Sequence, residues 1–105
     1  MVNIKELLAT LSGNELDNLV YDKIMHGKSE MVVFRVPQYS NDPRAIFAGF
    51  GLDAEMGLRG FNLSLQSFGG TWAAIYGAEN KTGPRVVHKD VCRAICGAAL
   101  GVVLE

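Results

Sequence analysis

The chain has 105 residues, of which 49% are hydrophobic and 20% are charged, and this composition excludes an intrinsically disordered protein. Ten basic and eleven acidic residues give a formal net charge of -1 at pH 7, so no long-range positive field attracts nucleic acid or an anionic membrane. A chain of this length forms one hydrophobic core. Leu104 and Glu105 resemble the scar of a cloning site, so we expect a single globular domain over residues 1–103.

The N-terminal segment and the two cysteines indicate the cellular compartment of the protein. The first eight residues lack the basic-then-apolar order of a signal peptide, and the apolar tail 94–104 is far shorter than the roughly 20 residues that span a bilayer. Cys92 and Cys96 are the only cysteines, and four-residue spacing in a helix does not give disulfide geometry. We therefore predict a cytoplasmic protein.

Helical patterns open the chain. Residues 4–11 have helical spacing over barely two turns, which predicts a short helix or an ordered arm. Residues 12–15, Ser-Gly-Asn-Glu, form a capping box, so a longer helix begins at Ser12. Its apolar stripe runs to Ile24, Asp17 is among the residues placed mostly on the wet side, and Gly27 supplies a stop.

A strand and a second short helix follow. Residues 31–36, Met-Val-Val-Phe-Arg-Val, are β-branched and aromatic and precede a proline, which indicates a strand. Asn41-Asp42-Pro43 joins a capping side chain to a proline suited to the first helical position. This helix is expected to end near Gly49 or Gly51, and the glycine-rich stretch to residue 60 is interpreted as a loop.

A hairpin and a final helix complete the pattern. Residues 61–66 alternate between apolar and polar, residues 71–76 form a second extended run, and two glycines between them supply the turn. The apolar residues of the first strand are expected to be buried: Phe61, Leu63 and Leu65. Residues 78–85 are predicted to be a surface connection. From about His88 or Asp90 onward, apolar residues recur at helical spacing, and the small ones among them would let the helix lie close against the sheet.

These elements predict an α/β or α+β fold in the order helix, strand, short helix, hairpin, helix. A small, mostly antiparallel sheet of about three strands would be covered by helices on one face. Because such a sheet leaves edges and part of one face unprotected, a homodimer or a protein partner is expected.

Two features, one glycine-rich and one acidic, have residue types that can carry chemistry. Residues 49–54, Gly-Phe-Gly-Leu-Asp-Ala, fit the loose dinucleotide pattern, whose glycines admit a pyrophosphate after a strand. A helical pattern precedes them here, so helix-end and loop glycines are the interpretation and no cofactor is predicted. Asp53 and Glu55, an acid-base pair in principle, are interpreted as solvated loop charges, and no catalytic residue is predicted.

His88, Cys92 and Cys96 are soft metal ligands at four-residue intervals. On a helix rising about 1.5 Å per residue, the first and last lie roughly 12 Å apart, too far to share one ion. Buried structural cysteines are therefore the interpretation and no metal is predicted. A small enzyme or metal protein that uses this face stays as an alternative.

The segment from residue 81 to 93 holds four bases against one acid: Lys81, Arg85, Lys89 and Arg93. They are the candidate contacts for nucleic acid or for a partner, and a solvated face is the other interpretation. No stacking aromatic is interleaved with them, so nucleic-acid binding is an alternative and is disfavoured.

Four short segments appear in the order found in a known group. They are residues 11–17 with Val20, residues 39–42, residues 72–74, and Gly83-Pro84 leading to Arg93-Ala94 in the last helix. In this the chain resembles the phage ABA sandwich proteins, small phage- and prophage-encoded proteins of unknown function. The resemblance implies helices packed on a sheet and a mobile-element origin, without an activity. The leading function hypothesis is a non-enzymatic phage or prophage accessory protein that binds another protein.

Overall fold

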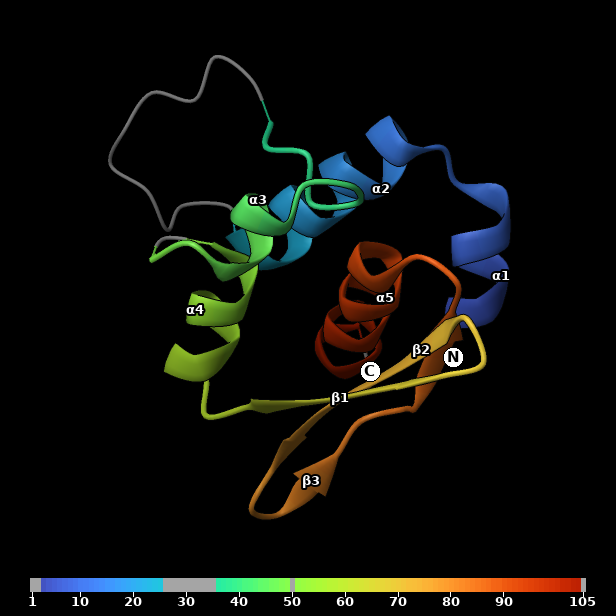
Figure 1. Cartoon of the computed structure of the whole chain (residues 1–105). Coiled ribbons are helices and arrows are strands. Elements are labelled where there is room, and N and C mark those ends of the chain that lie inside the picture. Colours follow the sequence, from blue (N-terminus) through green and yellow to red (C-terminus); the bar gives the residue numbers. More distant parts are fainter. Residues whose placement is uncertain (1–2, 26–35, 50, 105) are drawn as a thin grey trace.

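The computed structural model describes residues 3–25, 36–49 and 51–104 (Figure 1). They form helices and a four-stranded antiparallel sheet, so the predicted α+β class is confirmed. Of the strand predicted over residues 31–36, only Val36 lies within the described residues, and it is not in a strand. Among the described residues, no helix is both long enough and apolar enough to cross a membrane.

Both N-terminal helices begin after a capping side chain, of which the sequence indicated the one at Ser12. Helix α1 (Ile4–Thr10) begins after Asn3, whose side chain accepts the N–H of Glu6. Helix α2 (Gly13–Val20) follows the capping box of Ser12, with both of its hydrogen bonds present. A π-helical turn, η1 (Tyr21–Met25), extends α2, and the predicted stop at Gly27 lies outside the described residues.

The middle of the chain contains one more helix than the sequence predicted. Helix α3 (Pro43–Phe47) begins after Asp42, as expected. Helix α4 (Leu52–Leu58) replaces the predicted glycine-rich loop, which was therefore wrong. Leu52 and Met56, four residues apart on one helix face, are both fully buried, and the burial of two large side chains outweighs the poor helix propensity of the neighbouring glycines.

The sheet is built around its central strand. Strands β1 (Asn62–Phe68) and β2 (Thr71–Ala78) form the predicted hairpin. Its turn residues, Gly69 and Gly70, have φ angles of 58° and 82°, the left-handed backbone that two-residue hairpin turns require.

The other side of β2 pairs with two short strands. These are β3 (Lys81–Thr82) and β4 (Val86–His88), which are separated by a break over residues 83–85. Strands β3 and β4 both pair with the same edge of β2, one after the other. The sheet is therefore three strands wide, which agrees with the expected sheet of about three strands. The sequence missed β4, since three residues are too few to show a strand pattern.

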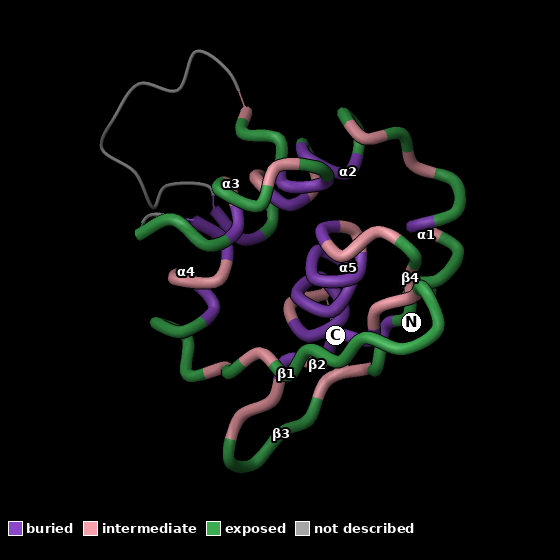
Figure 2. Tube along the Cα trace, viewed as in Figure 1, coloured by how far each residue is buried: buried purple, intermediate pink, exposed green. Residues whose placement is uncertain are grey.

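Helix α5 (Val91–Val103) lies across one face of the sheet, and its N-terminus is capped by Asp90 (Figures 1 and 2). It packs on β2 and β4, while β1 contacts α4. Phe61 and Leu63 are consequently only half-buried and Leu65 is 38% exposed, so the predicted burial of Leu65 was wrong. Helix α5 does not extend far enough over this edge strand to cover it.

Candidate functional site

The four candidate contact bases serve different purposes in the fold. Arg93 donates to the carbonyl oxygens of Leu8 and Leu11 at 3.2 and 3.4 Å, which holds α1 against α5. Lys81 donates to the carbonyl of Val102 at 3.5 Å. The guanidinium of Arg85 lies 5.3 Å from the centre of the Phe68 ring.

Lys89, the fourth candidate base, is exposed beyond the end of β4. Lys81 and Arg93 donate to backbone carbonyl oxygens, whereas Arg85 and Lys89 make no such bond within the described residues. The four candidates do not act as a single cationic cluster.

The His88, Cys92 and Cys96 row does not exist as one helix face. His88 ends β4, and its Nδ1 accepts the N–H of Asp90 at 2.9 Å, so the placement of all three on a helix was wrong. Among the described residues no group of three His, Cys, Asp or Glu side chains could hold a metal ion.

Both cysteines lie within the core. The thiol of Cys96 donates to the carbonyl of Tyr39 at 3.3 Å. Burial raises the pKa of Cys96 and of Cys92, and nearby carboxylates, Asp17 for Cys96 and Asp90 for Cys92, raise it further. Because the thiolate is the reactive form, both groups are held in the unreactive state.

Asp53 and Glu55 are helix residues with internal partners, so their interpretation as solvated loop charges was wrong. The Tyr76 hydroxyl donates to Asp53 Oδ1 at 2.8 Å, and burial together with this bond raises the pKa of Tyr76. Glu55 is 7% exposed and pairs with Arg59 at 3.2 Å, while Arg59 also donates to the carbonyl of Ile24. Asp53 thus connects α4 to β2, and Arg59, paired with Glu55, connects α4 to η1.

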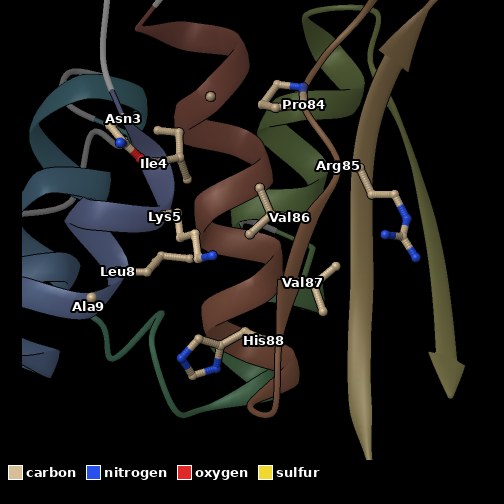
Figure 3. A pocket seen from close by; sticks show the side chains of 11 residues that line it. Asn3, Ile4, Lys5, Leu8, Ala9, Pro84, Arg85, Val86, Val87 and His88 are labelled. Atoms are coloured by element: carbon tan, nitrogen blue, oxygen red, sulfur yellow. The ribbon is translucent and has the colours of Figure 1, made fainter. Parts of the chain in front are cut away.

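A groove of about 1030 Å³ runs between α1 and β4, with α5 behind it (Figure 3). Ile4 and Leu8 form one wall and Val86 forms the other, with Gly101 of α5 also lining the space. This groove could not be predicted from the sequence, because its walls are about eighty positions apart and one of them is the unpredicted strand β4.

The ionisable side chains that line the groove are basic: Lys5, Arg85 and His88. Figure 3 shows the Lys5 side chain reaching from α1 into the space and His88 lying at its end, while Arg85 and Val87 point away on the other side of β4. Because Nδ1 of His88 accepts a backbone N–H, its other ring nitrogen carries the proton. No carboxylate is among the described residues that line the groove. The groove is therefore suited to an apolar segment that carries a negative charge.

Backbone groups of β4 also face the groove. In a two-residue hairpin, Phe68 and Thr71 exchange hydrogen bonds, so the alternation along β2 directs the peptide groups of Trp72, Ala74 and Tyr76 toward β3 and β4. The bond from the Gly83 N–H to the Tyr76 carbonyl, at 2.9 Å, fits this alternation.

The register of β4 then fixes which of its peptide groups remain available. His88 and Val86 lie opposite Trp72 and Ala74, so their peptide groups bond to β2. Those of Val87, between them, therefore point away from β2, along the free edge of β4. This edge can hydrogen-bond an added strand.

No protein-family model matches the chain, and no match was found among the curated proteins or among the solved structures.

Proposed function

We propose that this protein is a non-enzymatic accessory protein of a phage or prophage that works by binding an extended segment of another protein. The segment adds to β4 as a further strand and lies in the groove opposite α1. The observation that carries the proposal is the outward-facing peptide of Val87 beside this groove. Addition of a peptide strand at a sheet edge is a recurrent mode of protein recognition, in which backbone bonds give affinity and side-chain pockets give specificity.

The charge of the groove defines the partner segment. Lys5 and His88 are the donors beside apolar walls, and no carboxylate lines the described groove. A segment with apolar side chains toward α5 and one Asp or Glu near Lys5 satisfies both features. A hydrogen bond to a charged group contributes about 1.5–3 kcal/mol, so this one contact changes affinity about tenfold or more.

The remaining parts of the proposal have their own support. The buried, protonated thiols of Cys92 and Cys96 favour a binding role over nucleophilic catalysis, and their lack of disulfide partners supports a cytoplasmic location. The phage or prophage origin is supported by the resemblance to the phage ABA sandwich group.

Selection from a displayed library of random decapeptides tests the binding site. We expect the wild-type protein to enrich sequences that combine β-branched or aromatic residues with an acidic residue. Lys5→Glu should weaken the selected peptides about tenfold or more, because it places a carboxylate against theirs. Val87→Pro should weaken them as well, since proline removes the outward N–H of β4.

Lys23→Glu is the matched control, because it reverses an exposed lysine on η1, which does not line the groove. It should bind the peptides as the wild type does. Enrichment of no sequence, or equal binding by Lys5→Glu and the wild type, would show that the groove is not the binding site.

A further inference from the structure

Strand β1 forms an edge of the sheet that lacks the usual protection. Its seven residues, Asn62–Phe68, include no charged residue and no proline, and they pair with β2 in an unbroken register without a bulge. Natural proteins protect edge strands with charges, prolines or bulges, because an open edge pairs with other strands. Within the described residues, β1 pairs with β2 alone.

Exposed apolar side chains concentrate around the same edge. Five large hydrophobic side chains are exposed among the described residues, and three of them lie between residues 58 and 68: Leu58 at 85%, Leu65 at 38% and Phe68 at 44%. Figure 2 shows most of β1 as exposed. Leu65 and Phe68 project to opposite faces of β1, so apolar surface is exposed on both sides of this edge.

The hairpin register determines which peptide groups of β1 are free. Because Phe68 bonds to Thr71 across the turn, alternate residues from Phe68 back to Asn62 direct their peptide groups to β2. The peptide groups of Leu63, Leu65 and Ser67 therefore point outward, with the two-residue spacing that a further antiparallel strand requires.

We propose that β1 pairs antiparallel with β1 of a second copy of this chain, about a two-fold axis at Leu65. Leu65 then lies opposite its own counterpart, and Leu63 lies opposite Ser67 on each side of the axis. Each of these three pairs exchanges two backbone hydrogen bonds, and the two sheets become one continuous sheet. The exposed Leu65 lies on the same face as the buried Ala74, beyond the reach of α5, and is covered there by its own counterpart.

Charge favours a second copy as the occupant of this edge. An antiparallel strand pairs with itself without penalty only if no like charges lie opposite each other, and β1 has none. The formal charge of the whole chain is -1, so two copies repel each other little. A two-fold interface of this kind is closed, so it stops at a dimer and does not form fibres.

This dimer goes beyond the proposed function and is independent of it, because β1 and β4 lie on opposite sides of β2. A subunit can thus bind a partner segment at one edge and its twin at the other. Lys5→Glu should weaken peptide binding about tenfold or more and leave the dimer intact, so failure of one proposal is distinguishable from failure of the other.

Sedimentation velocity over a range of protein concentrations tests the dimer. We expect a concentration-dependent dimer for the wild type and a monomer for Leu65→Lys, which places two like charges on the axis. Phe47→Lys is the matched control, since Phe47 is 53% exposed on α3, outside β1, and its variant should still dimerise. Far-UV circular dichroism verifies that each variant is folded.

Cross-linking tests the register. In the proposed pairing, Ser64 of one copy lies opposite Gln66 of the other at a non-hydrogen-bonded position, where side chains are close enough for a disulfide. A mixture of Ser64→Cys and Gln66→Cys proteins should form a mixed disulfide under mild oxidation, whereas each variant alone should not. The native cysteines are buried and should not interfere.

Three results would overturn the proposal. They are a wild-type monomer at the highest soluble concentration, a dimer that Leu65→Lys leaves intact, and self-cross-linking of either single variant in place of the mixed disulfide. The first would leave the β1 edge to a strand of a different protein.

Discussion

Asp17 shows how a single side chain connects distant parts of the chain. The helical pattern placed it mostly on the wet side, yet it is only 4% exposed, so that placement was wrong. Its Oδ1 accepts the N–H of Ser40 at 2.7 Å, and the Ser40 hydroxyl donates to the carbonyl of Gly13 at 3.3 Å. A carboxylate that accepts a buried backbone N–H is satisfied inside the protein, and helical periodicity alone cannot reveal such a partner.

We expect Asp17→Ala to lower the free energy of unfolding by about 1–3 kcal/mol, because it leaves the buried N–H of Ser40 without an acceptor. Asp17→Asn retains a side-chain oxygen and should lose less. Asp22→Ala, at an exposed position of η1, is the control and should change stability by less than about 0.5 kcal/mol. Urea denaturation measures all three, and equal stability of Asp17→Ala and Asp22→Ala would mean that the Ser40 bond contributes nothing.

Helix boundaries were predictable where the capping chemistry is local. Ser12, Asp42 and Asp90 each accept a backbone N–H of the helix that follows, and each stands within three residues of the group it binds. Helix α4 was missed because its signal is not local. Leu52 and Met56 become helical by packing into the core, and the glycines around them pointed to a loop.

A glycine inside α4 lowers the stability of this helix, because glycine is a poor helix former. Gly57 lies in the last turn of α4, is exposed, and has open space where a Cβ would be. Gly57→Ala should therefore raise the free energy of unfolding by about 0.4–1 kcal/mol, because alanine lowers the entropy of the unfolded chain. Gly70→Ala is the contrasting variant, since a φ of 82° strains any residue with a Cβ, and it should destabilise.

Thermal unfolding followed by circular dichroism compares the two glycine variants directly. Destabilisation by Gly57→Ala would contradict the assignment of residues 52–58 as a helix with room for a side chain.

The candidate site is a property of the whole molecule, and this is why sequence reasoning did not find it. Lys5 stands in a segment that predicted only a short helix or arm, and His88 was assigned to the final helix. The fold brings them to one groove because α5 packs against both α1 and β4. Of the predicted bases, only Arg85 lines the groove, and its side chain points away from it (Figure 3).

Small residues of α5 let α1 and β4 pack closely against this helix. The sequence predicted such close packing for the sheet. A Cβ at Gly97 would lie 2.8 Å from Leu8 Cδ1 and 2.9 Å from Val86 Cγ1, so α1 and β4 both meet the helix there. A Cβ at Gly101 would overlap the ring of Pro84. Flexible side-chain ends can move aside at the first site, but the proline ring is rigid and cannot do so at the second.

Gly101→Ala should therefore lower the free energy of unfolding by about 1–3 kcal/mol, because the added methyl overpacks the contact between α5 and Pro84. Gly57→Ala makes the same chemical change where there is room, so the difference between the two variants isolates the packing from helix propensity. Pro84 stands two residues before β4, so a displacement of Pro84 should also disturb the β4 edge at Val87. The variant should therefore bind the peptides selected on the wild type more weakly. Urea denaturation and fluorescence anisotropy of a labelled peptide measure the two effects. Unchanged stability in Gly101→Ala would mean that the groove wall yields freely, and a groove with a yielding wall could not hold a strand in a fixed register.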